Sequence, residues 1–522
     1  MSYSDTRRHH QRTFTLTAPT EDGMHDTTTT GGSASGRDES GGLQQGLTTR
    51  QISMIGLSGA LGTGLFLGSG SMIKMAGPAI VVSYTLTGLL ALIVVWSLAE
   101  MTTQHPVAGG FGASAHAYLG PMGGFLARWN VAVTMCIAVG AEVTAAAKYL
   151  QRWFPDLNSA LGTVLCSLIL ILINLATVRL YGASEYWFSI LKVATVIVFI
   201  ALGVVMIFVG LPGRAATGLS NLTAHGGFAP HGAGAILAAA VMAIFSFGGA
   251  ENVSVTAAES ADPVKDIPKA AKAMIFRLII FYVGAIAVVV ALEPWTVSAE
   301  GEGLMASPFV KVLAAANIPG AADFMNLVLI VAALSAGNGC LYASSRMLHS
   351  LGTDRMAPAS FAVTTAEGSP RKAVTAASAG MVVASVLALW RPDDAFMLLF
   401  GVLVFGLWLT WLLIVVTYLA FKPTRRRLGL PDSPVQLTGG VPMAFVGFLV
   451  LAGVGVSLAF IPGLTIAWQI GGPYLLVMLL GYLVADRSRR GAPEDSVLTR
   501  ELAARDQSES ASAQAVAATV VD

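Results

Sequence analysis

A cluster of small, helix-breaking residues lies in the middle of the first long apolar segment, residues 52–75. The bilayer core offers no water to bare backbone groups, so such a break persists only where they are buried in protein or line a cavity. Freed amide and carbonyl groups can hold a ligand. Small residues also permit close Gly-xxx-Gly packing of helices, and this segment alone favours neither explanation. The residues concerned are Ser58, Gly59, Ala60, Gly62, Thr63 and Gly64.

A second break lies near the middle of residues 233–258 and contains Phe245, Ser246, Gly248, Gly249 and Glu251. The N-terminal end of a half-helix carries about half a positive elementary charge and attracts a carboxylate. Carbonyl groups left bare at a break accept hydrogen bonds from an ammonium group. An amino acid zwitterion carries both groups, so paired breaks predict a carrier for a small zwitterion.

Ionisable residues inside apolar segments are costly, and a functional role is their default interpretation. Lys192 could exchange a proton at physiological pH, although a place near a helix end would let it reach the interface. Glu251 is expected to keep a gate in register rather than to pair with a substrate cation. For Glu142 the sequence favours neither of two roles, a buried hydrogen-bonding partner or a pocket residue. A cationic substrate would require one of these two carboxylates to face the cavity.

The composition indicates a polytopic membrane protein. Only 12% of the 522 residues are charged, 54% are hydrophobic and the mean hydropathy is +0.69, whereas about a quarter of the residues in a soluble chain are charged. The net charge of +1 gives no indication of nucleic acid binding. All three cysteines lie in apolar segments, which argues against a disulfide framework or a metal site; they are Cys136, Cys166 and Cys340.

The expected fold is all-α, because twelve apolar segments reach the length of about 20 residues needed to cross the hydrocarbon core. They span residues 52–75, 79–101, 122–151, 160–179, 186–210, 233–258, 274–294, 322–349, 373–390, 394–421, 441–462 and 467–486. A transporter domain would thus cover residues 50–486. Residues 1–49 and 487–522 are polar and are expected to be disordered tails. The first tail lacks the apolar core of a cleavable signal.

The distribution of basic residues predicts the orientation. Lysines and arginines concentrate after spans 6, 8, 10 and 12, whereas the opposite connections hold scarcely one each. The positive-inside rule therefore places both tails in the cytoplasm. Spans 1 and 6, which carry the breaks, would begin two inverted groups of five. Glu100 and Glu259, near cytoplasmic helix ends, fit solvated or latch roles, and no ligand role is expected for the connection residues His105, His225 and His231.

Several motifs point to a known family. They include GALGTGLFLGSG at residues 59–70, SLAEM at 97–101 and SAGNGCLYASSRML at 335–348. Together they resemble amino acid permeases of the amino acid–polyamine–organocation superfamily over residues 45–425, and residues 248–295 look most like the γ-aminobutyrate permease branch. The family's Gly-Glu-x-Glu before helix 5 reads Gly-Ala-Ser-Glu at residues 182–185. This departure puts in doubt a cytoplasmic network built on the first carboxylate.

The resemblance implies a five-plus-five inverted-repeat fold with the substrate held between helices 1, 3, 6, 8 and 10. It implies that the amides of residues 62–64 hold the substrate's carboxylate and that the carbonyls of Phe245, Ser246 and Gly248 take its amino group. Phe245 would also be an aromatic gate. In related proton-coupled permeases a lysine at the position of Lys192 replaces a bound sodium ion, which implies a proton-coupling role.

The main prediction is a secondary active transporter that carries a neutral or ω-amino acid with protons across the plasma membrane. An exchanger of amino acids or amines stays open as an alternative, because exchangers share the broken helices. A receptor is disfavoured because the tails hold no output module, and a channel because no filter motif occurs. The sequence shows no nucleophile with a positioned base, so an enzyme is not expected. The expected partners are an amino acid, protons and the lipid bilayer, with no cofactor, metal or nucleic acid.

Overall fold

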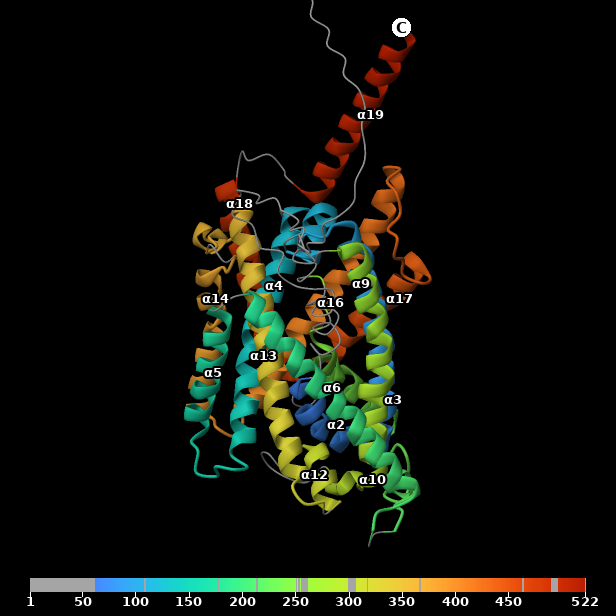
Figure 1. The fold of residues 1–522 in the computed structure, drawn as a ribbon, viewed down its shortest axis with the longest axis vertical. Coiled ribbons are helices and arrows are strands. Elements are labelled where there is room, and N and C mark those ends of the chain that lie inside the picture. The colour runs from blue at the N-terminus through green and yellow to red at the C-terminus, as the bar shows by residue number, and fades with distance from the viewer. Residues whose placement is uncertain are drawn as a thin grey trace, which may run out of the picture. The chain divides into compact units, whose positions relative to one another are not determined.

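The part of the chain that the structure, a computed structural model, describes consists of helices and their connections, without a strand (Figure 1). All the described residues lie within Gly41–Asp522. The expected N-terminal tail lies outside them. The structure describes residues 62–107, 109–175, 178–212, 215–249, 251, 254, 262–298, 307–316, 318–365, 368–461, 464–489 and 496–521.

The first two apolar segments form helices that meet at a reversal. Gly62 lies in a bend, and the chain then enters a π-helix that runs directly into an α-helix. Short π turns of this kind frequently mark functional sites. The chain reverses at Gly77, whose φ of +60° suits a residue without a Cβ. The elements are η1 (Gly64–Gly68), α2 (Ser69–Ala76), η2 (Gly77–Ala79) and α3 (Ile80–Gln104).

The remaining elements are also helical. In chain order they are α4 (Phe111–Leu150), α5 (Ser159–Leu175), α6 (Val178–Phe208), η3 (Ser220–Leu222), α7 (Gly232–Ala243), η4 (Ile244–Phe247), α9 (Pro263–Phe276), η6 (Arg277–Gly284), α10 (Ala285–Leu292), α11 (Trp295–Ser298), α12 (Pro308–Ala315), α13 (Ala321–Thr353), η8 (Ala359–Ala362), α14 (Arg371–Ala377), α15 (Ala379–Trp390), α16 (Ala395–Arg427), α17 (Gly440–Ser457), α18 (Thr465–Arg489) and α19 (Val497–Val521).

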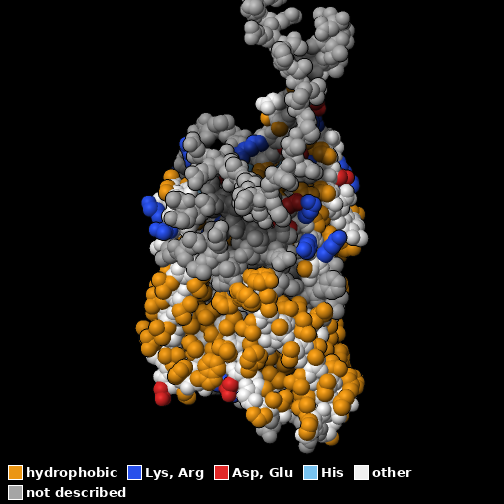
Figure 2. Space-filling view, viewed as in Figure 1, with side chains coloured by type: hydrophobic (Ala, Val, Ile, Leu, Met, Phe, Trp, Pro, Cys, Tyr) orange, Lys and Arg blue, Asp and Glu red, His pale blue; other side chains and the backbone are white. Residues whose placement is uncertain are grey.

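The apolar character of these helices confirms the prediction of a polytopic membrane protein. Among the described residues, eight helical segments are long and apolar enough to cross a bilayer, and three shorter apolar helices accompany them. Large apolar side chains face outward along them, among them Leu172 on α5, Val198 on α6 and Leu389 on α15. Figure 2 shows hydrophobic side chains covering a broad band, with charged side chains at its edges. Such a surface suits lipid rather than water.

Helix α4 packs along both α13 and α16, and it carries Glu142 into the space between them. Gly120, with a φ of +81°, and the following Pro121 interrupt α4 in its first third. A Cβ on Gly380 of α15 would lie 1.7 Å from the carbonyl oxygen of Cys136, so only glycine allows α15 to touch the α4 backbone. Close packing of this kind is typical of helix contacts in membranes.

The predicted interruption of the sixth apolar segment is present. Helix α7 ends in the 3-10 turn η4, and the chain leaves helical geometry at Gly248, where ψ is 147°. Gly249 follows with a φ of +90°, in the region that glycine tolerates best. The sixth apolar segment, α7 with η4, is called helix 6 and the first, η1 with α2, helix 1; helix 6 is distinct from the element α6 (Val178–Phe208).

The structure corrects the expectation of a disordered C-terminal tail, because Val497–Val521 forms helix α19. Seven of its 25 residues are alanine, the best helix former, which favours this conformation. It is also attached to the end of α16: the Glu501 carboxylate accepts a hydrogen bond from Arg425 at 2.7 Å, and the Arg505 guanidinium donates to the Leu428 carbonyl at 3.0 Å. The polar sequence predicts a solvated tail, whereas the contacts with the end of α16 support a helix.

Candidate functional site

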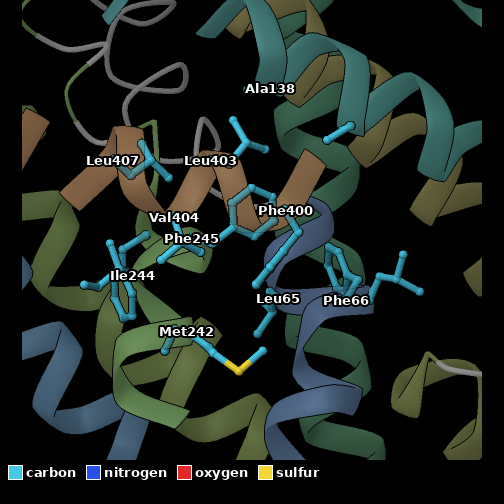
Figure 3. Close-up of a cluster of buried hydrophobic side chains, with 14 of the residues drawn as sticks. Leu65, Phe66, Ala138, Met242, Ile244, Phe245, Phe400, Leu403, Val404 and Leu407 are labelled. Atoms are coloured by element: carbon cyan, nitrogen blue, oxygen red, sulfur yellow. The ribbon is translucent and has the colours of Figure 1, made fainter. Parts of the chain in front are cut away.

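Described residues of the two predicted breaks touch each other. A Cβ on Gly64 would lie 2.8 Å from Phe245 Cδ1 and 2.8 Å from Ser246 Cα, so glycine is the residue that allows this contact. A cavity lies at the contact, and Figure 3 shows apolar side chains of helix 1, helix 6 and α16 gathered beside it. Its lining includes Gly62, Gly64, Phe245, Gly248 and Gly249 from the breaks, Ala138 and Glu142 from α4, Ala336 and Cys340 from α13, and Leu407 from α16.

Only part of the predicted carboxylate-binding segment lies within the described residues. Gly62, Thr63 and Gly64 are described and buried, whereas Ser58, Gly59 and Ala60 are not among the described residues. The Thr63 amide donates a hydrogen bond to Glu142 Oε1 at 3.4 Å. Glu142 is thus both a buried hydrogen-bonding partner of Thr63 and part of the cavity lining.

The carbonyls of helix 6 are partly engaged. The Ser246 carbonyl accepts a hydrogen bond from the Tyr282 hydroxyl at 2.6 Å, and the Phe245 carbonyl accepts one from the Gly248 amide at 3.1 Å. The hydroxyls of Ser246 and Tyr84 lie 2.9 Å apart and are hydrogen-bonded. A carbonyl oxygen has two lone pairs, so each of these carbonyls keeps capacity for one further donor such as an ammonium group.

Phe245 lies where a gate would be expected. Its ring packs edge-to-face against Phe400 of α16, with centroids 4.7 Å apart, and it lines the cavity (Figure 3). Edge-to-face packing holds an aromatic ring in one orientation while leaving its other face available. The contact joins helix 6 to α16, so a movement of one would displace the other.

Lys192 is completely buried and does not reach the interface, which removes the alternative that it snorkels. Its ammonium group donates a hydrogen bond to Ser335 Oγ of α13 at 2.9 Å. Ser335 in turn donates to Glu185 Oε2 at 2.7 Å, and Asn338 Nδ2 donates to Glu185 Oε1 at 2.8 Å. Asn174 Nδ2 of α5 donates a hydrogen bond to the side-chain oxygen Oδ1 of Asn338 at 2.5 Å. A buried acid and a buried base are thus joined through one hydroxyl.

The partnership of Glu185 with Lys192 is a feature that the sequence analysis missed. A signal was available, because the two residues are seven apart and so lie two turns apart on one face of helix α6. Of the two carboxylates in the family motif, this chain keeps only the second, Glu185. The structure shows that this second carboxylate carries the buried network.

The other predicted acids occupy different surroundings. Glu251 is buried, and its carbonyl accepts hydrogen bonds from the Ser254 amide and hydroxyl, at 3.0 and 2.7 Å. Its gating role stays a prediction. Glu259 lies outside the described residues.

Glu100 is the centre of a buried network rather than a solvated residue. Its Oε1 accepts from the Lys422 ammonium group at 2.7 Å, and its Oε2 accepts from the Tyr418 hydroxyl at 2.7 Å and the Leu437 amide at 2.9 Å. Lys422 also donates to the partly exposed Asp432 at 2.8 Å. The contacts fasten the end of α3 to the end of α16 and support the latch interpretation.

We expect Glu100→Ala to destabilise the protein by about 3–5 kcal/mol, because it leaves the buried Lys422 ammonium group without its main partner. Thermal unfolding of the purified protein in detergent measures the loss. The double variant Glu100→Ala/Lys422→Met removes both charges and is expected to recover most of the stability. Asp432→Asn, which alters the exposed partner, serves as a mild control. Equal melting temperatures for the single variant and the wild type would contradict the assignment.

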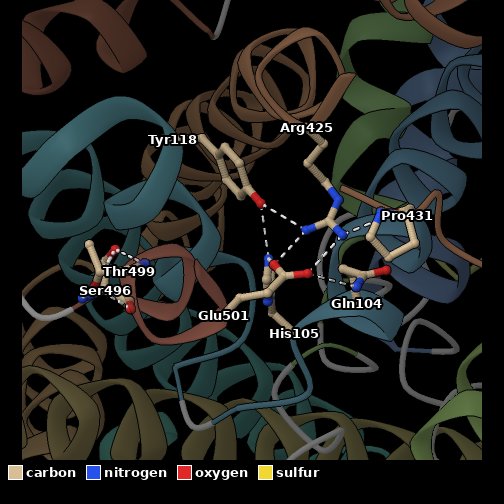
Figure 4. A network of polar contacts seen from close by, with 8 residues as sticks. All are labelled: Gln104, His105, Tyr118, Arg425, Pro431, Ser496, Thr499 and Glu501. Carbon is tan, nitrogen blue, oxygen red and sulfur yellow. Dashed lines mark hydrogen bonds and ion pairs between the residues drawn. The ribbon is translucent and has the colours of Figure 1, made fainter. Parts of the chain in front are cut away.

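A second network joins α3, α4, α16 and the C-terminal helix (Figure 4). Glu501 of α19 accepts two hydrogen bonds from Arg425, at 2.7 and 2.9 Å, and lies 3.8 Å from His105 Nε2. The same histidine nitrogen lies 3.0 Å from the Tyr118 hydroxyl. His105 was expected only to occupy a connection, yet it is almost fully buried in this network.

Protonation of His105 is expected to destabilise the fold. Burial lowers the pKa of His105 from 6.5 to about 4, with Glu501 acting to raise it and Arg425 to lower it. Because the folded pKa is depressed, the unfolded chain binds more protons, and stability is lost as the pH falls from about 6.5 to about 4. The predicted loss between pH 7 and pH 5 is about 2 kcal/mol. His105→Gln should show a smaller fall in melting temperature over this range, and identical pH profiles would contradict the prediction.

The outward apolar surface and the long apolar helices define a class, that of helical membrane proteins, and this one has an internal cavity. The amino acid permease family model matches residues 51–492. The chain belongs to the amino acid permease family, which confirms the resemblance found in the sequence.

Individual relatives match over nearly their whole length. The γ-aminobutyric acid permease of Bacillus subtilis (strain 168) is 36% identical over 443 residues, which cover 85% of this chain and 94% of that protein. The aromatic amino acid transport protein AroP of Escherichia coli (strain K12) is 35% identical over 450 residues, or 86% and 97% of the two chains. The amino acid permease YtnA of Bacillus subtilis (strain 168), named as uncharacterized, is 35% identical over 445 residues, or 84% and 94%. All three are named as permeases or transport proteins, not as enzymes.

Proposed function

We propose that this protein carries a neutral or ω-amino acid across the plasma membrane together with protons. Membership of the amino acid permease family supports amino acid transport. The relatives named for γ-aminobutyric acid and for aromatic amino acids make these two compounds the first candidates. The observation that carries the proton part is Lys192, a completely buried ammonium group linked through Ser335 to the Glu185 carboxylate.

The proposed substrate site lies between the two breaks. The amides of residues 62–64, with the adjoining Ser58, Gly59 and Ala60, would bind the substrate's carboxylate, as expected at the start of a half-helix. The carbonyls of Phe245, Ser246 and Gly248 would accept from its amino group. Gly249 gives the break its turn, and Glu251 would keep helix 6 in register. Apart from Glu142, the cavity lining has no ionisable carboxylate or basic side chain, and its small and apolar residues suit a substrate side chain without charge.

The proposed topology is twelve spans arranged as two inverted groups of five with two further helices, both termini being cytoplasmic. Described helical residues occur in every one of the twelve expected spans, which supports the count. The basic residues after spans 6, 8, 10 and 12 support the orientation. A cysteine-accessibility or reporter-fusion scan of the connections tests both points.

Uptake into proteoliposomes tests the proposed function. Purified protein is reconstituted with an empty lumen, and labelled γ-aminobutyrate or L-phenylalanine is supplied outside under an inward proton gradient. Accumulation that collapses when a protonophore is added supports symport. Uptake only after the lumen is preloaded with substrate would instead identify an exchanger. Competition of one labelled substrate against a panel of amino acids then defines the side-chain preference.

A further inference from the structure

Helix α19 is docked on the helix bundle by its N-terminal turns. Ser496, directly before the helix, is buried, Glu501 is partly buried, and residues 503–512 are exposed. The Thr499 amide donates a hydrogen bond to the Ser496 hydroxyl at 3.2 Å, and the Ser496 amide donates to the Thr499 hydroxyl at 2.8 Å. This reciprocal pair has the pattern of a capping box, which fixes the point at which a helix begins. The docked turns therefore have a defined start beside the bundle.

Glu501 makes the main polar contact of this docking (Figure 4). Its carboxylate accepts two hydrogen bonds from Arg425 of α16 and a third from the side-chain amide of Gln104, the last residue of α3, at 3.4 Å. Arg425 also donates to the Tyr118 hydroxyl of α4 at 3.4 Å. Only 2% of the Arg425 side chain is exposed, so little water can replace a lost carboxylate. One carboxylate of α19 thus connects the ends of α3, α4 and α16.

Helices α3 and α4 belong to two groups that each form part of the cavity wall. Helix α3 packs along α7, and its Tyr84 hydroxyl is hydrogen-bonded to the Ser246 hydroxyl of helix 6 at 2.9 Å. Helix α4 packs along α13, and these two helices supply Glu142 and Cys340 to the cavity lining. The contact between α3 and α4 themselves is much smaller than either of these. The cavity therefore lies in a seam between a group that contains helix 6 and a group that contains α4 and α13.

The contacts of Glu501 cross this seam at one end. A carrier releases its substrate by moving such groups of helices apart on one side of the membrane. Opening the seam where α19 lies separates the end of α3, with Gln104, from the end of α4, with Tyr118. Glu501 binds the first directly and the second through Arg425, so these bonds must break before the cavity opens there. Conformational steps often set the turnover rate, so a contact that opposes them slows the whole cycle.

We propose that α19 is a brake on the carrier: its N-terminal turns bind across the seam through Glu501 and slow the opening of the cavity on that side. The proposal rests on the proposed function, because only a carrier alternates between two openings. Release of α19 leaves the substrate site as it is, since no described residue of α19 lines the cavity. Arg425 keeps the Pro431 carbonyl, at 2.8 Å, as an acceptor when the helix detaches, which lessens the cost of release.

Transport rates of variants test the brake. Full-length protein is reconstituted in proteoliposomes, initial uptake of labelled γ-aminobutyrate or L-phenylalanine is measured over a range of concentrations, and calorimetry gives the Kd. Glu501→Gln keeps the size of the side chain but removes its charge, and a chain that ends at residue 495 lacks the helix. Glu509→Gln alters an exposed acid of the same helix, whose partner Arg505 lies 3.3 Å away, and is the matched control. A chain that ends at residue 512 keeps the docked turns and is the second control.

Glu501→Gln and the chain that ends at residue 495 are expected to raise the maximal uptake rate about two- to fivefold, as for the loss of a partly exposed ion pair, with an unchanged Kd. Both controls are expected to transport at the wild-type rate. Adding Glu501→Gln to Arg425→Gln should give no further increase, because the brake acts through this pair. A maximal rate for Glu501→Gln equal to or below that of the wild type overturns the proposal, since a merely stabilising helix would not restrain the cycle.

Amide hydrogen exchange tests the brake without a substrate. In nanodiscs, the ends of α3 and α4, residues 100–105 and 111–118, are expected to exchange faster in Glu501→Gln than in the wild type, because the seam opens more often. Glu509→Gln should exchange like the wild type. Equal exchange in Glu501→Gln and the wild type overturns the proposal. Failure of the wild type to take up either amino acid counts against the proposed function, and the exchange comparison then decides whether α19 restrains the seam.

Discussion

Gly64→Ala is expected to abolish transport or to weaken substrate affinity at least tenfold. The new methyl carbon would lie 2.8 Å from Ser246 Cα and 3.0 Å from the Ser246 amide nitrogen, so backbone rather than a flexible side chain obstructs it. Phe245 Cδ1 lies at 2.8 Å on the same side. Overpacking of this kind costs about 1–3 kcal/mol, and separating the breaks would move the proposed carboxylate and ammonium sites apart. Initial uptake rates and ligand binding by the purified protein measure the effect.

A nearby glycine provides the control for this substitution. A Cβ on Gly68, one turn along the same helix, would meet Phe400 Cε2 at 3.4 Å and Met72 Cε at 3.5 Å. These are side-chain ends at ordinary contact distances, so Gly68→Ala should keep at least half of the wild-type uptake rate. Similar losses for both variants would indicate a general intolerance of helix 1, and unchanged uptake by Gly64→Ala would show that the breaks need not touch.

The sequence was sufficient for features that arise from local backbone chemistry. Glycines inside apolar segments predicted where helix 6 loses its hydrogen-bonding pattern, and Phe245 to Gly249 show that interruption. Helix existence and membrane character followed from apolar length. The single-sequence argument also identified Lys192 as an unusual charge, because such a residue is rare within a spanning segment whatever the tertiary structure.

Features that depend on contacts between distant segments could not be predicted in the same way. Glu142 reaches Thr63 across 79 residues because glycines on helix 1 and α13 admit its carboxyl group, and no local pattern encodes that approach. Glu185 gains its role from Ser335 and Asn338 of α13. Helix α19 likewise depends on the contact between Glu501 and Arg425 as well as on propensity. In each case, tertiary contact determines the function of a residue whose type alone was ambiguous.

Lys192→Met is expected to eliminate accumulation driven by a proton gradient. With one proton per substrate, a gradient of one pH unit supplies about 1.4 kcal/mol and sustains about a tenfold substrate gradient. Without the buried cation, the Glu185 carboxylate loses the positive charge to which Ser335 links it, and the expected accumulation ratio falls to about one. Methionine has similar length and packs in apolar surroundings, so the change removes charge with little loss of volume. Proteoliposomes with imposed pH gradients measure the ratio.

Loss of coupling must be separated from loss of folding, because Lys192→Met leaves a buried carboxylate whose hydrogen-bond chain through Ser335 has lost its cation. The double variant Lys192→Met/Glu185→Gln removes both charges and should regain thermal stability while still failing to accumulate substrate. Lys148→Met is the matched lysine control, since this residue lies near the end of α4 and donates only to the Asp393 carbonyl at 3.3 Å. It should accumulate substrate like the wild type. Full accumulation by stable Lys192→Met protein would exclude Lys192 from proton coupling.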